Sequence, residues 1–435
     1  MVKHQLIDEF KRSGKPDKSV FQTLIFRVLG LGLILLLQIL LARLMGPKNY
    51  GDYTIIVTVI NIGLVVSVFG FDSSVQRFLP YSLQSNKLSK ANGFLKFSGI
   101  AVFLSSLGCA ILLFGFLLIK SKSFNSSFNE GLFWGIFALP VLAFSIRASA
   151  ILRSIKMIKL SLLPTYFLFP LLMGISCWYY FSIYHKLTVD AVMLISLCVS
   201  IFIYLFINRR KSIWIKEVLP EVDAEYDRKL WLSVSSVLLL TTLLDLILKQ
   251  SDILMVGYFL GNTKAGVYSV AAKLATLAAL GLAVADYVIM PKISSLYESK
   301  QLGKLQQTIR AAAFQILSIS LPVIAGLIIF GKIILNFFGK TYQEAYFPLL
   351  VLLIGQFINA ITGMVGGLMT MTGHQRQFFI FYFFAILLQF GLNVVLIKQL
   401  GIIGASLGTS LAMIFLNVCA YRFVKRKLKI RAGIL

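Results

Sequence analysis

The sequence is poor in charge, in histidine and in cysteine, and each shortage excludes a class of protein. Only 14% of the 435 residues are charged whereas 58% are hydrophobic, so the chain could not hide its apolar surface as a soluble domain. The three histidines lie far apart without ligand spacing, which argues against a zinc site. The four cysteines fall in apolar stretches and indicate no disulfide framework. Composition therefore predicts an integral membrane protein.

Motifs for catalysis and phosphate binding are also lacking. There is no Gly-x-x-x-x-Gly-Lys-Ser/Thr loop, so we do not expect ATP hydrolysis within this chain. The first twenty residues are polar and mixed in charge, unlike a cleaved signal peptide, so the first helix should stay attached. Nothing resembles a nucleic-acid-binding module despite the net charge of +25. We expect no enzymatic activity, no cofactor, no metal site and no nucleic-acid partner.

Long apolar runs make up most of the chain. About 20 apolar residues are needed for a helix to cross the hydrocarbon core of a bilayer. The sequence holds twelve such candidates, which predicts an all-α integral membrane protein with twelve transmembrane helices. The expected spans are 21–42, 53–76, 97–119, 132–152, 160–182, 190–207, 232–260, 265–290, 311–330, 347–372, 377–397 and 400–421.

An internal repeat divides these spans into two sets of six. The segment 46–53, GPKNYGDY, has the same glycine and tyrosine spacing as 261–268, GNTKAGVY, 215 residues later. Six spans return the chain to its starting side, so the copies should be parallel repeats about an axis along the membrane normal. We place the lobes at 1–217 and 218–435. Duplicated lobes with a substrate site between them are typical of secondary transporters.

Lysine and arginine are concentrated in alternate loops. Most of the 42 fall at the two ends of the chain and in the loops on that same side. Since loops rich in these residues stay in the cytoplasm, both termini are expected to be cytoplasmic. The net charge of +25 mostly reflects this bias, which also favours contact with anionic membrane lipid.

The seventh span, 232–260, carries Asp245, Lys249 and Asp252. At about 100° per residue these three side chains share one stripe of about 60°. They could form an ion-pair ladder that only pins the helix to a neighbour. Each charge is unfavourable in a membrane by about 2.5–3.5 kcal/mol on insertion scales, which favours an ion or substrate path.

Other polar residues occur at helical spacing within the spans. Arg27 and Gln38 are eleven residues apart in the first span and so return to the same face, although Arg27 could simply snorkel. The same spacing relates Asn61 and Asp72 in the second span, and Lys273 lies in the eighth. These side chains are candidates for lining a central cleft.

Amides occur in pairs in the C-terminal half. Gln356 with Asn359, and Gln389 with Asn393, have helical spacing that suits either sugar hydroxyls or hydrogen bonds between helices. Arg147 falls at an inner helix end, where we expect it to snorkel or to anchor the helix.

Two stretches resemble a known family. Residues 42–53, ARLMGPKNYGDY, followed by 69–78, FGFDSSVQRF, resemble the opening of polysaccharide-repeat-unit flippases of the multidrug/oligosaccharidyl-lipid/polysaccharide exporter superfamily. Residues 251–261, SDILMVGYFLG, and 266–274, GVYSVAAKL, resemble the seventh-to-eighth helix junction of that family. The length, the twelve spans and the repeat offset are similar over the whole chain.

The resemblance implies a V-shaped pair of six-helix bundles whose cationic central cavity alternates between the two faces of the bacterial cytoplasmic (inner) membrane. The cargo would be a lipid-linked oligosaccharide on a polyprenyl diphosphate, and H+ or Na+ would drive transport. Basic residues would hold the diphosphate, and amides or hydroxyls would contact the sugar. A polysaccharide polymerase and other assembly proteins would be partners.

These expectations define two sets of site residues. The expected substrate-binding residues are Arg27, Gln38, Lys249, Lys273, Gln356 and Asn359. The expected ion-coupling residues are Asp72, Asp245 and Asp252.

Three alternatives remain open. A cation-coupled drug exporter of the same superfamily is the nearest. It would have a cavity with surplus acidic and aromatic residues, and the deep charges here, being of both signs, do not decide between the two. A peptidoglycan-precursor flippase is less favoured, since that branch has two extra helices. A polysaccharide polymerase needs a catalytic outer loop, and the longest one here, 331–346, has only about sixteen residues.

Overall fold

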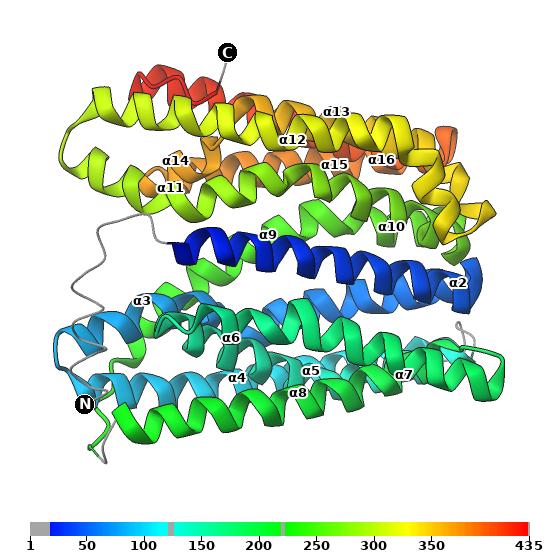
Figure 1. Cartoon of the computed structure of the whole chain (residues 1–435), viewed down its shortest axis with the longest axis horizontal. Coiled ribbons are helices and arrows are strands. Elements are labelled where there is room, and N and C mark those ends of the chain that lie inside the picture. Colours follow the sequence, from blue (N-terminus) through cyan, green and yellow to red (C-terminus); the bar gives the residue numbers. More distant parts are fainter. Residues whose placement is uncertain (1–17, 121–125, 219–221, 434–435) are drawn as a thin grey trace. The chain divides into compact units, whose positions relative to one another are not determined.

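The computed structural model describes residues 18–120, 126–218 and 222–433, and within these ranges the chain is all-α, without a β-strand (Figure 1). Eleven described segments are long and apolar enough to cross a membrane. The first of them, Phe26–Gln84, covers the first two predicted spans, so the twelve predicted spans are all helical. The prediction of an all-α, multi-pass membrane protein is confirmed.

The helices follow one another with short connections. Their bounds are α2 (Lys18–Val68), α3 (Phe71–Gln84), α4 (Leu88–Lys120), α5 (Ser126–Ser154), α6 (Ile158–Leu163), η2 (Pro164–Leu168), α7 (Phe169–Tyr184), α8 (Val189–Val218), α9 (Arg228–Leu260), α10 (Asn262–Thr276), η3 (Leu277–Ala279), α11 (Leu280–Glu298), α12 (Leu302–Phe338), η4 (Lys340–Ala345), α13 (Tyr346–Thr362), α14 (Val365–Met371), α15 (Gln375–Leu400), α16 (Ile402–Phe423) and η5 (Val424–Leu428).

The chain forms two compact units that exchange segments. Unit 1 contains the residues up to Gln38 together with Ile60–Thr242, and unit 2 contains Ile39–Val59 together with Leu243–Leu435. Part of α2 therefore packs with the second half of the sequence, and the first part of α9 packs with the first half. The predicted lobes, 1–217 and 218–435, follow the sequence repeat and are not the same as these packing units. The lobe boundary therefore stays a prediction.

In unit 1, α5 is the central helix and packs against α4 and α8, which lie beside it in Figure 1. Residues 222–227, which precede α9, are held against α4. Its Glu225 pairs with Lys90 at 3.1 Å, and the Asn92 side-chain amide donates to the carbonyl oxygen of Val222 at 2.6 Å. These residues therefore belong to the folded body of unit 1.

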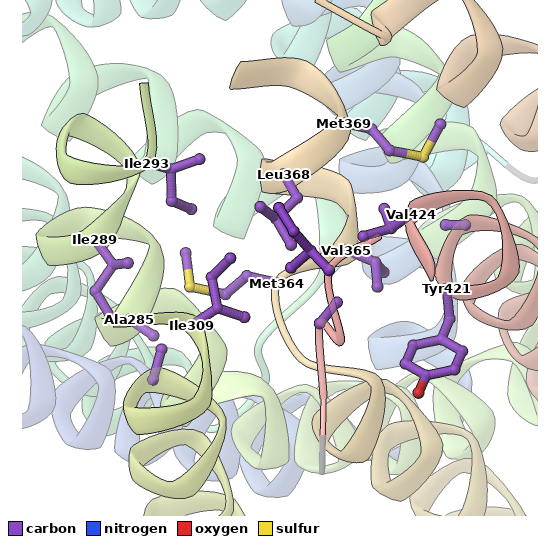
Figure 2. Packing of buried hydrophobic residues seen from close by; sticks show 14 of the residues in the cluster. Ala285, Ile289, Ile293, Ile309, Met364, Val365, Leu368, Met369, Tyr421 and Val424 are labelled. Carbon is purple, nitrogen blue, oxygen red and sulfur yellow. The ribbon is translucent and has the colours of Figure 1, made fainter. Parts of the chain in front are cut away.

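In unit 2, a hydrophobic cluster joins the ends of α11, α12, α14 and α16 (Figure 2). Ile293 and Leu368 are fully buried in it. The segment after η5 completes the cluster, because Ala432 is fully buried and its carbonyl oxygen faces Gly363, where α13 ends. Gln306 fixes this segment by bonding both the N–H and the C=O of Arg431, at 2.8 and 2.9 Å.

The repeated glycines have a clear structural reason. Gly46 has φ 74° and ψ 168°, and Gly261 has φ 85° and ψ 165°, so both copies use the same backbone conformation that residues with a Cβ rarely adopt. Gly51 and Gly266 lie where α2 and α10 cross within unit 2. A Cβ on Gly266 would lie 2.9 Å from the Gly51 Cα, and one on Gly51 would overlap the carbonyl oxygen of Asn262. The repeat therefore encodes a matched pair of breaks and a close crossing.

Several predicted spans are not continuous α-helices. The second span is interrupted at Phe69 and Gly70, which both have positive φ, so that α2 ends and α3 begins there. Asn61 and Asp72 consequently lie on different helices. The prediction that their eleven-residue spacing puts Asn61 and Asp72 on one helix face is wrong, because the helix is not continuous between them. The fifth span contains the π-helical turn η2, and the tenth breaks at Gly363.

Candidate functional site

Unit 2 contains a cavity of about 510 Å³ between α9, α10, α11, α13, α14, α15 and α16. Small residues of α10 and of the α13–α14 break leave room for it. Its polar and charged lining consists of Asp245, Lys249, Asp252, Thr276, Gln356, Asn359, Thr370, Tyr382, Thr409, Ser410 and Asn417. Five of the nine predicted site residues therefore meet in one cavity.

The α9 stripe faces this cavity, as its helical spacing indicated. The Lys249 ammonium donates to Asp245 Oδ2 at 2.7 Å, and the Tyr382 hydroxyl donates to Asp245 Oδ1 at 2.9 Å. The Lys249 and Asp245 side chains are 60% and 39% exposed, so this ion pair is not buried within unit 2. The pair is held between α9 and α15 and remains accessible to a ligand.

Asp252 lies on the same stripe but in a different environment. It is only 1% exposed, and no ion pair joins it to any residue in the described ranges. Its Oδ2 accepts from the hydroxyls of Tyr268 and Thr409 at 2.6 and 2.9 Å, and its Oδ1 accepts from the Ile253 N–H at 2.8 Å. The three charges therefore do not form the alternative ion-pair ladder: Asp245 and Lys249 form a pair, and Asp252 is a separate, buried carboxyl group.

Two buried amides extend the surroundings of Asp252. Gln389 donates to the Leu248 carbonyl oxygen and to Thr409 Oγ1, both at 3.0 Å, which confirms the interpretation of this residue as a link between helices. The Gln389 Oε1 and the Asn393 Oδ1 are buried without a hydrogen-bond partner in the described structure. Thr409 thus links Gln389 to Asp252, whereas the Asn393 amide lies against Met255 and Gly408.

Gln356 and Asn359 line the opposite wall, on α13. The side chain of Asn359 makes no hydrogen bond to any described residue, and the Gln356 Oε1 is buried without a partner among them. These two amides are therefore available for an incoming ligand, in contrast to the occupied amide of Gln389.

Charge at the cavity is scarce and of both signs. Its described lining contains two carboxyl groups, on Asp245 and Asp252, and one ammonium group, on Lys249. With both of these carboxyls ionised, the described charged groups sum to one negative charge. Protonation of Asp252 alone would make the sum of these described groups zero.

Lys273 is not among the residues that line the cavity. Its ammonium lies 3.1 Å from the Tyr50 hydroxyl and 5.2 Å from the centre of that ring. Lys273 thus packs on the crossing of α10 with α2, in a cation–π arrangement.

Arg27, Gln38 and Asp72 belong to unit 1, so the described cavity does not include them. Arg27 and Gln38 remain on one continuous stretch of α2. Asp72 lies in the first turn of α3, where the Ser73 hydroxyl donates to its carboxylate at 3.3 Å. All three side chains are partly exposed.

The expectation that Arg147 snorkels is wrong. Arg147 is 6% exposed and donates from α5 to the Ser98 hydroxyl at 3.0 and 3.2 Å and to the Leu95 carbonyl oxygen. Gly99 leaves the space that its guanidinium occupies, and no acid among the described residues pairs with it. Its position near a helix end could not reveal that it points into the bundle.

Sequence reasoning also missed the hydroxyl groups that hold the two carboxylates. Tyr268, Tyr382 and Thr409 come from three different helices. Of these three residues only Tyr268 had a signal in the sequence, because it is the last residue of the repeated glycine motif. Among the described residues no three of His, Cys, Asp and Glu gather as a metal cluster, so any ion at Asp252 would need amide and hydroxyl oxygens as ligands.

Comparison with known proteins gives a family match and one curated relative. The family described as "Polysaccharide biosynthesis protein" matches residues 40–347. The probable flippase AglR of Haloferax volcanii is 26% identical over 175 residues, which is 39% of this chain and 37% of that relative. The chain therefore matches well under half the length of this relative.

Solved structures of transporters share the fold. An inward-facing multidrug resistance MATE family transporter of the MOP superfamily gives a TM-score of 0.74 at 15% identity, over 93% of this chain and 98% of that one. A MOP superfamily transporter from Pyrococcus furiosus, described as having a binding pocket of reverse polarity, gives 0.72 at 15% identity over 96% of both chains. The lipid II flippase MurJ, inward closed, gives 0.64 at 17% identity over 92% and 86%. At these identities the likeness establishes the fold.

Proposed function

Because the chain belongs to the polysaccharide biosynthesis protein family, we propose that it is a flippase that moves polyprenyl-diphosphate-linked oligosaccharides across the cytoplasmic membrane by alternating access. The charged diphosphate and the polar sugar cannot cross hydrocarbon unaided, so such a lipid requires a protein path. The names of a relative, a probable flippase, and of a structural neighbour, a lipid II flippase, support this class of cargo.

One observation supports the proposal most. Unit 2 surrounds a cavity of about 510 Å³ that is lined by available amides and by an accessible ion pair. This volume is in the range of small-molecule binding sites. A helix bundle that served only as a scaffold would fill such a space with apolar side chains, because unpaired buried polar groups are destabilising.

We assign the coupling ion to Asp252. It is buried, lacks a cationic partner in the described structure and is surrounded by the hydroxyls of Tyr268 and Thr409. A proton on the carboxyl group, or a sodium ion bound by the carboxylate and hydroxyl oxygens, would each supply the missing positive charge. Asp245 is the weaker candidate, since Lys249 already balances its charge.

The diphosphate needs cations that are not already paired. Arg27, Lys249 and Lys273 were the predicted ones, and Lys249 is bound to Asp245. The same proposal places the protein in a bacterial cytoplasmic membrane with both chain termini in the cytoplasm. It also includes a polysaccharide polymerase as a partner.

A second candidate function is export of organic cations driven by an ion gradient. The specific observation in its favour is the cavity itself, with two carboxyl groups against one ammonium group and with Phe378 and Tyr382 in its wall. A lipophilic cation would suit such a lining. The family match favours the polysaccharide-related cargo over this alternative.

The experiment is a lipid extraction from cells that lack this protein. We expect a polyprenyl-diphosphate oligosaccharide to accumulate, the intact gene to clear it, and Asp252→Asn to fail to do so at equal protein level. Gln315→Leu, on the exposed face of α12, is the matched control and should clear the lipid. Absence of accumulation, together with altered resistance to cationic drugs, would replace the flippase proposal by the exporter.

A further inference from the structure

We propose that the unit 2 cavity holds the uncharged sugar portion of the cargo and that the diphosphate binds outside it. This assignment rests on the proposed function, because it assumes that the cargo is a lipid-linked oligosaccharide with a sugar part and a diphosphate part. It also changes the role expected of Lys249, which becomes a polar contact for sugar instead of a phosphate ligand. Its basis is the charge, the hydrogen-bonding capacity and the shape of the cavity wall.

The charge of the wall opposes a diphosphate. Asp245 and Asp252 outnumber Lys249, the only basic residue in the described lining, and Lys249 is already bonded to Asp245 at 2.7 Å. A diphosphate has at least two negative charges and would meet a neutral or negative wall in a medium of low dielectric constant, where repulsion is strong. Stable binding of phosphate groups requires unpaired cations or several converging N–H groups.

The hydrogen-bonding groups of the wall suit sugar hydroxyls. Asn359 has an amide with no partner in the described structure, and Gln356, which also lines the cavity, has an unpaired Oε1. Amides both donate and accept, as sugar hydroxyls do. The Thr370 hydroxyl donates to the backbone at 2.9 Å, so its oxygen is left as an acceptor. A neutral polyhydroxyl ligand can satisfy all of these groups at once.

The remaining wall is apolar, small and partly aromatic. Ala272, Ala275 and Ala279 form one side, and Phe378 with Tyr382 forms another, the two rings meeting edge to face at 5.0 Å. A pocket with a mostly apolar wall and a few placed polar groups is the usual form of a small-molecule site. The C–H faces of a sugar ring would lie against the aromatic side, and its hydroxyls would reach the α13 amides.

The test measures binding of separate parts of the cargo to the full-length protein in lipid nanodiscs. One probe is the oligosaccharide released by mild acid from the lipid fraction of the source cells, and the other is undecaprenyl diphosphate without sugar. The variant is Gln356→Leu with Asn359→Leu, and Gln315→Leu, which exposes the same new apolar group on α12, is the control. A milder pair, Gln356→Asn with Asn359→Ser, serves if the leucine variant does not fold.

We expect the released oligosaccharide to bind the wild-type and control proteins and to bind the leucine variant at least about tenfold more weakly, since two hydrogen bonds are lost. The affinity for undecaprenyl diphosphate should change less than about twofold. The assignment is overturned if the variant loses diphosphate binding instead, or if it binds the oligosaccharide as well as the control does.

A second measurement, of whether the wild-type protein flips the intact lipid, distinguishes failure of this inference from failure of the proposed function. Flipping without any binding of the released oligosaccharide would overturn the cavity assignment and leave the flippase proposal standing. Binding of the oligosaccharide that depends on Gln356 and Asn359, in a protein that flips no lipid, would overturn the flippase proposal and keep the sugar site.

Discussion

The two units bury charges of opposite sign in different surroundings. In unit 1, Arg147 is bonded to a serine hydroxyl and a backbone carbonyl oxygen of α4. In unit 2, Asp252 is bonded to two hydroxyls and a backbone N–H, beside a cavity. Neither has an oppositely charged partner among the described residues. Unit 1 thus uses its buried charge to join two helices, whereas unit 2 places one where a ligand or an ion could reach it.

The repeat makes this difference sharper. The offset of 215 residues that relates Gly46 to Gly261 also relates Leu37 to Asp252, on the helices that lead into those glycines. Leu37 is 5% exposed and Asp252 is 1% exposed, so the same buried position is apolar in one copy and acidic in the other. Duplication preserved the backbone breaks, and the chemistry of the two copies diverged at single positions.

The largest expected effect concerns the glycine crossing in unit 2. Gly51→Ala would place a methyl group on the carbonyl oxygen of Asn262, so we expect at least about 3 kcal/mol of destabilisation. Gly32→Ala in unit 1, where a Cβ would meet nothing within 4 Å, should leave stability unchanged or improve it by up to about 1 kcal/mol. Thermal unfolding in detergent measures both. Equal tolerance of the two substitutions would refute the close crossing.

The next effect tests the position that differs between the copies. Asp252→Leu gives unit 2 the residue that unit 1 has, and it leaves the hydroxyls of Tyr268 and Thr409 without their acceptor. We expect a loss of about 1–3 kcal/mol in stability and loss of ion-driven transport. Asp245→Asn, in the solvent-exposed pair, should lower stability by less than about 1 kcal/mol. Chemical unfolding of the purified variants distinguishes the two positions.

Arg147 tests the claim about unit 1. Replacement by methionine of similar length removes the donors to Ser98 and to the Leu95 carbonyl oxygen, and we expect about 2 kcal/mol of destabilisation. Arg77, which is exposed, should tolerate the same replacement within about 0.5 kcal/mol. If Arg147→Met were as stable as Arg77→Met and transport were lost, the charge of Arg147 would serve the cargo and not the packing.

The smallest effect concerns the segment that follows η5 in unit 2. Gln306→Ala removes two hydrogen bonds to the backbone of Arg431, and we expect about 1 kcal/mol of destabilisation. The neighbouring Gln307 is exposed, so Gln307→Ala should have no measurable effect. Proteolysis near residue 430 should become faster only in the first variant. The comparable contact in unit 1 is a single side-chain hydrogen bond, from the Asn92 amide to the carbonyl oxygen of Val222.

The membrane spans, the charged face of α9 and the internal repeat could be predicted because each has a signal in the local sequence. Apolar length predicted the spans, and helical periodicity placed Asp245, Lys249 and Asp252 on one side of α9, where the structure shows them facing a single cavity. The glycine spacing predicted the repeat, because a positive φ and a close crossing both require glycine.

Features that depend on tertiary packing could not be predicted in this way. The direction of Arg147 depends on the space left by Gly99 on another helix. The partners of Asp252 come from α10 and α16, at separations of 16 and 157 residues. Gly70 ends a helix, although glycine is also tolerated inside membrane helices, so the break after Val68 had no unambiguous sequence signal.

The most direct measurement reconstitutes the purified protein in vesicles containing a fluorescent polyprenyl-diphosphate oligosaccharide and follows its movement between leaflets. Proton and sodium gradients are imposed in turn, and Asp252→Asn is compared with Gln315→Leu. The proposed function predicts movement that one of the two gradients accelerates and that Asp252→Asn no longer couples to it. Movement that no gradient affects, or that is equal in both variants, would contradict the role of Asp252, and absence of movement would contradict the flippase itself.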